Sequence, residues 1–228
     1  MKSILYIFPH PDDESFGPAG SIHQEKQNGN EIHLLTLTQG GATKMRHKYN
    51  LSIEEMGKVR VKEMENVNKV LQFNSMTIWD YPDGELNNMN PNTLDAAISK
   101  YIKELKPDVV VTYTHHGISV HPDHLCGHAI IKKIFWDLKE EPYFHRLALF
   151  TVEGAGGKLN VEKYNQVDCR YLLNEDNRNK FIEALSCYES YKDVINETGV
   201  IEKVGSEVCY EFYNEEVGGE VGSIIEGL

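Results

Sequence analysis

The feature that most constrains the fold is a repeated alternation of short apolar runs and longer helical patterns. The apolar runs cover residues 4–8, 32–38, 109–114 and 147–152. The first run, ILYIF, is apolar at every position, which is typical of a strand buried on both faces of a parallel sheet. Parallel strands need helical crossovers, and the order strand, helix, strand recurs over the first 150 residues. The sequence therefore predicts an α/β fold with a doubly wound, mostly parallel sheet.

The remaining elements follow from helix caps, turns and shorter apolar runs. These signals predict helices from about residues 15–20 to 27, from 52 to 71, from 91–93 to 105, from 123 to 138 and from 175 to 191. They also predict strands at 76–80 and 167–173. Residues 1–150 should form a Rossmann-like part, followed by a smaller C-terminal β/α appendage. No internal repeat or linker interrupts the chain, so we expect a single domain over residues 1–228, with a frayed tail at 218–228.

Net charge and cysteine content indicate which binding partners and which cellular compartment are expected for this protein. The formal net charge is −12, and this acidic excess argues against binding to DNA, RNA or an anionic membrane surface. The four cysteines form no C-x-x-C pair and are expected to be reduced thiols of a cytoplasmic protein. No apolar stretch reaches about 18 residues, so no transmembrane helix is expected.

Two clusters of histidine and aspartate follow apolar runs. PHPDDE occupies residues 9–14 after the first run, and HPDH occupies 121–124 shortly after the third. Because ligands of open α/β sheets bind at the carboxyl ends of the strands, both clusters should lie at that edge. Their imidazoles and carboxylates are the ligand types of a catalytic zinc site, although Fe(II) accepts the same ligands. A divalent cation would offset the repulsion among the carboxylates, whereas either cluster alone could be a turn or a helix cap.

With both motifs, the chain resembles the PIG-L/LmbE-like family of zinc-dependent N-deacetylases over roughly residues 1–150. Members of that family remove acetyl groups from N-acetylglucosamine conjugates, including the precursors of mycothiol and bacillithiol. The resemblance implies that His10, Asp13 and His124 bind the metal, which is Zn²⁺ or another divalent transition metal such as Fe²⁺. It also implies a small glycoconjugate substrate. Family members often form trimers or hexamers, and the sequence leaves open whether this chain forms such a homo-oligomer.

The resemblance further implies roles for three neighbours of these ligands. Asp12 would be the general base that takes a proton from the metal-bound water. His121 would stabilise the oxyanion as an imidazolium, and Asp123 would hold its tautomer and orientation. Ser119 stands where some family members carry a catalytic tyrosine, and the sequence does not identify a residue that takes that role.

Three more residues are candidates for substrate binding. Arg60 forms an R-x-x-E pattern with Glu63 that resembles the family, although the pair could be an ordinary ion pair on a helix surface. Asp83 in YPDGEL matches a family turn near the active site, although an Asp-Gly turn also occurs without function. Glu14 could bind substrate, cap the following helix or orient a metal ligand.

The resemblance therefore implies a hydrolase that removes the N-acetyl group of a small N-acetylglucosamine conjugate. Two other functions stay open, namely a deacylase or esterase of a non-sugar substrate at the same site and a non-catalytic metal- or sugar-binding protein. The loops at residues 39–52 and around 154–158 are expected to define the substrate. The sequence names neither the group attached to the sugar nor the physiological metal.

Overall fold

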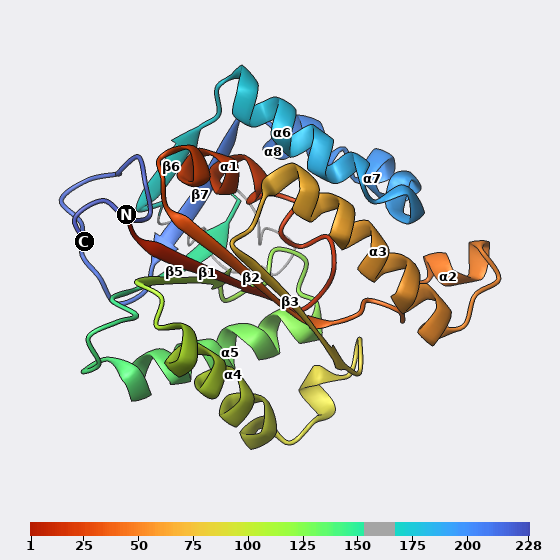
Figure 1. Ribbon diagram of the computed structural model, residues 1–228, viewed down its shortest axis with the longest axis horizontal. Helices are drawn as coiled ribbons and strands as arrows, with labels where there is room; N and C mark the ends of the chain where they lie inside the picture. The colour runs from red at the N-terminus through yellow and green to blue at the C-terminus, as the bar shows by residue number, and fades with distance from the viewer. Residues whose placement is uncertain (153–166) are drawn as a thin grey trace.

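A mixed β-sheet forms the centre of the computed structural model, which describes residues 1–152 and 167–228 (Figure 1). In these ranges the sheet has seven strands in the order β3-β2-β1-β4-β5-β7-β6. The strands are β1 (Ser3–Phe8), β2 (Glu31–Thr38), β3 (Ser75–Tyr81), β4 (Val109–Tyr113), β5 (Arg146–Thr151), β6 (Cys169–Leu172) and β7 (Glu207–Phe212). β1 pairs in parallel with β2 and β4, and parallel pairing continues to β3 and β5. The predicted doubly wound, mostly parallel sheet is confirmed.

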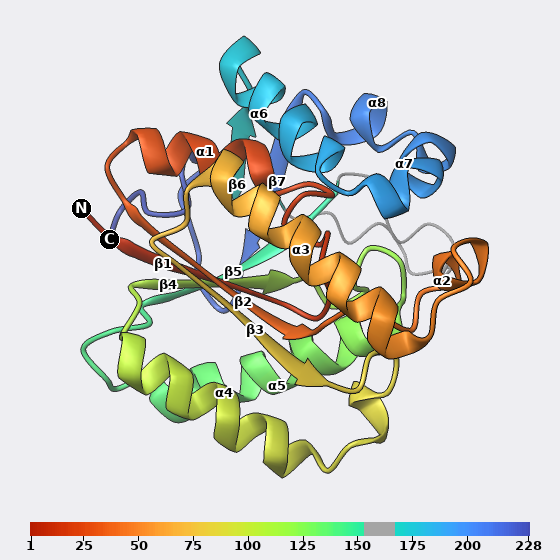
Figure 2. The same cartoon turned by 45° about the vertical axis from the view of Figure 1, so that its right-hand side comes forward.

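Helices cover both faces of this sheet, as Figure 2 shows. One face carries α1 (Ala19–Gln27), α3 (Ile53–Leu71) and α6 (Glu175–Ser186), and the other carries α4 (Pro91–Leu105) and α5 (Pro122–Leu138). The shorter elements are α2 (Met45–Lys48), α7 (Lys192–Thr198), α8 (Val200–Val204) and the 3₁₀ turns η1 (Leu86–Asn88) and η3 (Glu189–Tyr191).

β1 is covered by helices on both faces, which explains why residues 4–8 include no polar side chain. Ile4, Tyr6 and Phe8 point into the core under α1, α3 and α6, and Leu5 and Ile7 point into the core under α4 and α5. All five side chains are fully buried. Because side chains alternate between the faces of a strand, burial on both sides requires every position to be apolar.

The C-terminal part departs from the expected helix over 175–191. α6 ends at Ser186, whose hydroxyl donates to a carbonyl of its own helix, and η3, α7 and α8 follow as separate short pieces. β7, which the sequence did not predict, pairs antiparallel with β5 and β6. The expected fraying of 218–228 is wrong, because Val221 bridges Cys169 and Ile224 is fully buried. The expected substrate-defining segment around 154–158 lies outside the described residues.

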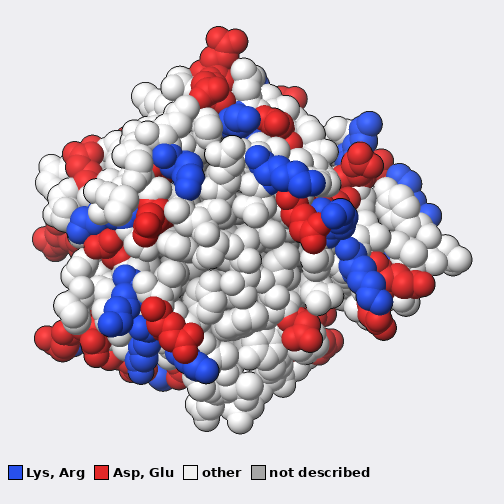
Figure 3. Space-filling view, viewed as in Figure 1, with Lys and Arg blue, Asp and Glu red and all other residues white. Residues whose placement is uncertain are grey.

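Charged side chains of both signs occur on the face of the molecule drawn in Figure 3. In Figure 3 acidic and basic side chains are interspersed around an uncharged centre, and no broad basic area covers that face. None of the helices in the described ranges combines the length and the apolar character that a membrane span requires.

Glu211 on β7 carries a largely buried carboxyl group whose ionisation should affect stability. It accepts hydrogen bonds from the Thr114 hydroxyl at 3.0 and 3.1 Å, and burial raises its pKa from 4.5 to about 7. The folded protein therefore holds this proton more tightly than the unfolded chain does. The contribution to stability is complete below pH 4.5 and is lost as the pH rises through about 7.

Glu211→Gln should remove this pH dependence. Urea unfolding between those two pH values should show a smaller fall in the free energy of unfolding for the variant than for the parent, by up to about 3 kcal/mol. An identical fall in both proteins would mean that the Glu211 carboxyl group titrates alike in the folded and unfolded chains.

Candidate metal and active site

Residues of both polar motifs line one cavity, at the edge of the sheet where β1 and β4 end. The cavity has a volume of about 960 Å³, and its lining includes His10, Asp12 and Asp13 from the first motif and His121 and His124 from the second. β1 and β4 are adjacent and parallel, so their carboxyl ends deliver both loops to the same place. The structure therefore brings together the two motifs as the sequence predicted.

The three expected metal ligands place their donor atoms close together. His10 Nδ1 lies 3.2 Å from His124 Nε2 and 3.6 Å from one carboxylate oxygen of Asp13. His124 Nε2 lies 3.4 Å from the other Asp13 oxygen. In a tetrahedral zinc site with bonds of about 2.0–2.1 Å, neighbouring ligand atoms are about 3.3–3.4 Å apart. The two imidazole donors therefore have the spacing of a zinc site, and each has a different Asp13 oxygen at 3.6 or 3.4 Å.

Hydrogen bonds outside this triangle hold the donors in place. The Tyr113 hydroxyl donates to Asp13 at 2.7 Å, and the His10 backbone N–H donates to the other Asp13 oxygen at 2.8 Å. His124 Nδ1 lies 2.8 Å from the Gly117 carbonyl oxygen, which requires a proton on Nδ1 and leaves the Nε2 lone pair free. The Tyr113 ring stacks on His124 with centroids 4.1 Å apart. These contacts orient ligands as outer partners do in metal sites.

The charges in the triangle favour an ionised carboxylate. Burial opposes ionisation of Asp13, but His124 and His10 outweigh it and hold its pKa well below the usual range. Burial also opposes a charged His10 ring, yet hydrogen bonds to Asp123, Asp13 and Asp83 raise the pKa of His10 well above its ordinary value. A site with this much negative charge around one imidazole is suited to a cation.

Asp12 lies beside this triangle with an arginine as its partner. Arg60 Nη2 lies 2.6 Å from an Asp12 oxygen, and the Asp12 backbone has φ of 94°. Burial raises the pKa of Asp12 to about 6, while Arg60 opposes the rise. Arg60 is 1% exposed, and its guanidinium lies 3.8 Å from the centroid of the Tyr191 ring. The alternative of a surface ion pair between Arg60 and Glu63 is therefore wrong.

The expected pairing of Asp123 with His121 is not the one observed. The Asp123 carboxylate lies 3.1 Å from His10 Nε2 and accepts hydrogen bonds from the backbone N–H groups of Gly84 and Leu86, at 2.8 and 3.0 Å. His121 is instead the N-cap of α5, and its Nδ1 accepts from the Asp123 backbone N–H at 3.2 Å. The carboxylate is free to reach His10 because the backbone, not the side chain, of Asp123 contacts His121.

The protonation state expected for His121 changes accordingly. Burial, together with the rings of His10 and His124, lowers the pKa of His121. A neutral ring that accepts at Nδ1 carries its proton on Nε2. His121 is therefore suited to donate a hydrogen bond as neutral imidazole, and the expected imidazolium is disfavoured.

Asp83 and Glu14, both expected to bind substrate, lie in different places. Asp83 lines the cavity, where one oxygen is 3.2 Å from His10 Nε2 and the other accepts from the Ala42 N–H at 2.7 Å. Glu14 is fully buried, and its Oε1 accepts from the hydroxyls of Ser15 and Tyr188, each at 2.6 Å. Burial raises the pKa of Glu14 to about 7. A substrate-binding role for Glu14 is wrong, because the side chain faces the interior.

The segment 188–191 contributes residues that the sequence reasoning missed. The N–H and hydroxyl of Ser190 both donate to the Glu63 carboxylate at 2.7 Å. Together with the bond from Tyr188 to Glu14 and the contact of Tyr191 with Arg60, they fasten this segment behind the first motif. No motif spacing links it to residues so distant in the chain. Tyr113, by contrast, ends the strand before the second motif, and its position at that edge was a usable signal.

Within the described residues, two groups of three side chains place one donor atom each within 4.8 Å of one another, and neither includes Asp13. One replaces Asp13 by His121, and the other combines His10 with Asp83 and Asp123. The second group would use His10 Nε2, the atom that faces both carboxylates, while Nδ1 faces Asp13 and His124. The His10 ring thus faces Asp13 and His124 with Nδ1 and the carboxylates of Asp83 and Asp123 with Nε2.

Proteins of known structure that share this fold include enzymes of different kinds, a deacetylase and a hydratase. A deacetylase of teicoplanin biosynthesis superposes with a TM-score of 0.73 at 15% identity, covering 93% of this chain and 99% of that chain. A 4-carboxy-2-hydroxymuconate hydratase from Pseudomonas putida KT2440 superposes with a TM-score of 0.70 at 16% identity, covering 95% and 98%. At such low identity these likenesses establish the fold alone, and the fold does not select the reaction.

Sequence comparison is more selective. A probable N-acetyl-α-D-glucosaminyl L-malate deacetylase 2 from Bacillus anthracis is 32% identical over 135 residues, which are 58% of this chain and 59% of that relative. The aligned part is thus about three fifths of each chain. A model of the PIG-L family, described as GlcNAc-PI de-N-acetylase, matches residues 5–135, which is more than half of the chain and includes both polar motifs. The chain therefore belongs to the PIG-L family.

Proposed function

We propose that the protein hydrolyses the N-acetyl amide of a small N-acetylglucosamine conjugate with the help of a divalent metal ion. The observation that carries the proposal is the triangle of donor atoms from His10, Asp13 and His124, with the Asp12 carboxylate in the same cavity. Family membership and the name of the Bacillus anthracis relative support the choice of an acetylated amino sugar as substrate.

His10, Asp13 and His124 would hold the ion, which is Zn²⁺ or another divalent transition metal such as Fe²⁺. When bound, the ion supplies Lewis-acid activation of a water molecule and of the amide carbonyl group. We favour this set over the set with His121, because Asp13 has oxygens 3.6 and 3.4 Å from the two imidazole donors. A carboxylate ligand also explains why Tyr113 and the His10 backbone hold Asp13 so firmly.

The chain's own residues move the protons. With a pKa of about 6, Asp12 is ionised at neutral pH and still basic enough to accept a proton from the attacking water. The Asp123 N–H occupies His121 Nδ1, so Nε2–H can donate to the carbonyl oxygen as negative charge develops there. Protonated Asp12 then passes its proton to the leaving amine. Arg60 keeps the carboxylate of Asp12 in position during both transfers.

The direct test is acetate release from N-acetylglucosamine and a panel of its conjugates by protein of measured metal content. We expect release that a chelator abolishes and that Zn²⁺ or Fe²⁺ restores. A protein that binds one equivalent of metal but releases acetate from none of these amides would contradict the proposal. Hydrolysis of non-sugar acetamides or esters at higher kcat/KM would favour the deacylase or esterase alternative instead.

Asp123 supplies a prediction that separates the observed arrangement from the expected one. If its carboxylate holds His10, then Asp123→Asn should weaken metal binding by about 10–100-fold, as loss of a hydrogen-bond partner behind a ligand does. Competition with a chromogenic chelator measures this affinity. Unchanged metal affinity together with a reduced kcat would instead point to a role of Asp123 in orienting His121.

A further inference from the structure

We infer that the wall of the cavity formed by α7, α8 and Met45 binds an apolar substituent of the substrate, such as an alkyl or aryl group linked to the sugar. The inference rests on the proposed function, because it concerns the conjugate whose acetyl group is removed. One cavity contains both this wall and the His and Asp cluster, and its volume of about 960 Å³ is near the upper end for small-molecule pockets. A sugar carrying a sizeable second group suits such a cavity.

Apolar side chains from three separate elements build this wall. Val194 of α7, Val200 and Val204 of α8, and Met45 of α2 all line the cavity. Val200 and Val204 are 5% and 8% exposed and belong to the core, so the wall has a fixed backing. Val194 and Met45 are only partly buried, which leaves apolar surface for a ligand to cover. Sugar hydroxyls placed against these side chains would lose hydrogen bonds to water without gaining protein partners.

The polar groups on this side of the cavity already have partners within the protein. The Thr198 hydroxyl donates to the Ile195 carbonyl oxygen at 3.0 Å, and Lys203 Nζ donates to the Thr198 carbonyl oxygen at 2.6 Å. The Tyr191 hydroxyl donates to the Thr43 hydroxyl oxygen at 2.8 Å. Each of these groups thus has one partner within the protein, and Val194, Val200, Val204 and Met45 supply the apolar surface that a ligand can cover.

Charge alone does not select a dicarboxylate such as malate at this position, because three aspartates and three lysine or arginine residues line the cavity in the described ranges. The Arg60 guanidinium is paired with Asp12, and Lys203 contacts a backbone carbonyl oxygen. Among the described lining residues, Lys44 is the remaining lysine or arginine, and it is exposed. Asp12, Asp13 and Asp83 line the same cavity and would repel added carboxylates.

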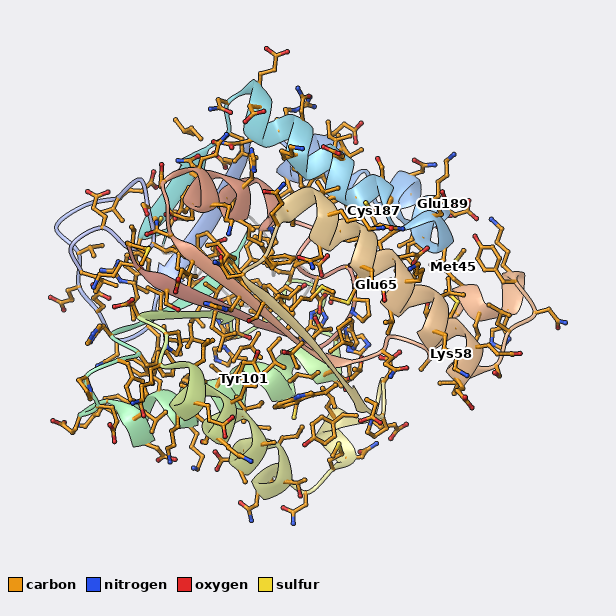
Figure 4. All side chains as sticks on the ribbon, viewed as in Figure 1. Met45, Lys58, Glu65, Tyr101, Cys187 and Glu189 are labelled. Carbon is orange, nitrogen blue, oxygen red and sulfur yellow. The ribbon has the colours of Figure 1, made fainter. Side chains whose placement is uncertain are left out.

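Polar contacts hold α2 against α7, so the residues of the wall have fixed positions relative to one another. Lys48 of α2 forms an ion pair with Asp193 of α7, and the adjoining Tyr49 hydroxyl lies 3.5 Å from the Glu189 carbonyl oxygen. Figure 4 shows Met45 and Glu189 on these neighbouring segments. α7 and α8 lie outside residues 5–135, the range that the family model matches. Val194, Val200 and Val204 of the wall therefore lie outside the matched range, whereas Met45 lies within it.

Alkyl glycosides of N-acetylglucosamine test the inference directly. We expect kcat/KM for acetate release to rise about three- to fourfold for each added methylene from the methyl to the hexyl glycoside, until the wall is covered. The L-malate glycoside should be a poorer substrate than the hexyl glycoside. A flat or falling series, or a preference for the malate glycoside, would overturn the inference while leaving the deacetylase proposal intact.

Binding of the deacetylated products separates failure of this inference from failure of the proposed reaction. The methyl and hexyl glycosides of glucosamine carry no acetyl group, so calorimetry reports their affinity without turnover. We expect the hexyl compound to bind at least about tenfold more tightly. If no compound releases acetate but the hexyl glycoside still binds more tightly than the methyl glycoside, the proposed reaction is contradicted and the apolar site is supported. Equal affinities would overturn the apolar site whatever the activity.

Two valine variants test whether the preference for the hexyl compound arises at this wall of the cavity. Val194→Asn should reduce the preference for the hexyl over the methyl compound to less than about threefold, since it removes apolar surface from the cavity. Val59→Asn makes the same change on α3, at a 36% exposed position outside this cavity, and should keep the preference. Circular dichroism confirms that both variants fold. Equal preferences in Val194→Asn and the parent would contradict the assignment of this wall.

Discussion

Replacing Asp12 by Asn should lower kcat for acetate release by about 10²–10⁴-fold, which is what a general base contributes, while the protein keeps its metal. Asparagine has nearly the same shape and can still accept the hydrogen bond from Arg60 Nη2, but it cannot take a proton. Acetate assays and metal analysis of the same preparation measure both quantities. A matched control is Asp80→Asn on β3, an exposed aspartate, which should leave kcat unchanged.

The pH dependence gives a second, independent check on Asp12. The base works only when ionised, so kcat/KM should fall as the pH decreases through the pKa of Asp12, which is about 6 without a bound cation. A cation in the neighbouring triangle favours the carboxylate, so the acid limb should lie at or below that value. Asp12→Asn should lack this limb. Loss of metal from the variant, or an unaltered acid limb, would show that Asp12 has another role.

Much of the fold and the location of the site could be predicted because they depend on short-range patterns. Residues 4–8 are apolar at every position, which is typical of a strand buried on both faces of a sheet. Adjacent parallel strands must then deliver His10 and His124 to one edge, whatever the intervening helices are. The donor triangle follows from these two constraints together with the motif spacing.

The partners behind the site could not be predicted, because long-range packing chooses them. Glu14 bonds to Tyr188, and Glu63 bonds to Ser190, across parts of the chain that no local pattern connects. Asp123 illustrates a subtler limit. Its place beside His121 in the chain suggested a pair, but position two of a helix aims the backbone N–H at the N-cap and leaves the carboxylate to reach His10.

His124→Ala should remove bound metal and abolish acetate release, because it deletes one of the three proposed protein ligands. The fall in metal affinity should exceed the roughly 100-fold upper limit for loss of an outer hydrogen-bond partner. His124 also stacks on Tyr113, so a folding check by circular dichroism accompanies the metal analysis. His145→Ala, at an exposed histidine where β5 begins, is the control that should keep both metal and activity.

His121→Ala then decides between the two ligand sets that share His10 and His124. If Asp13 completes the site, His121→Ala should retain metal and lose about 10²–10³-fold in kcat, as removal of an oxyanion donor does. If His121 is the third ligand, the variant should lose metal as His124→Ala does. We expect the first result, because Asp13 is held by Tyr113 and by the His10 backbone, whereas His121 Nδ1 is occupied by the N–H that begins α5.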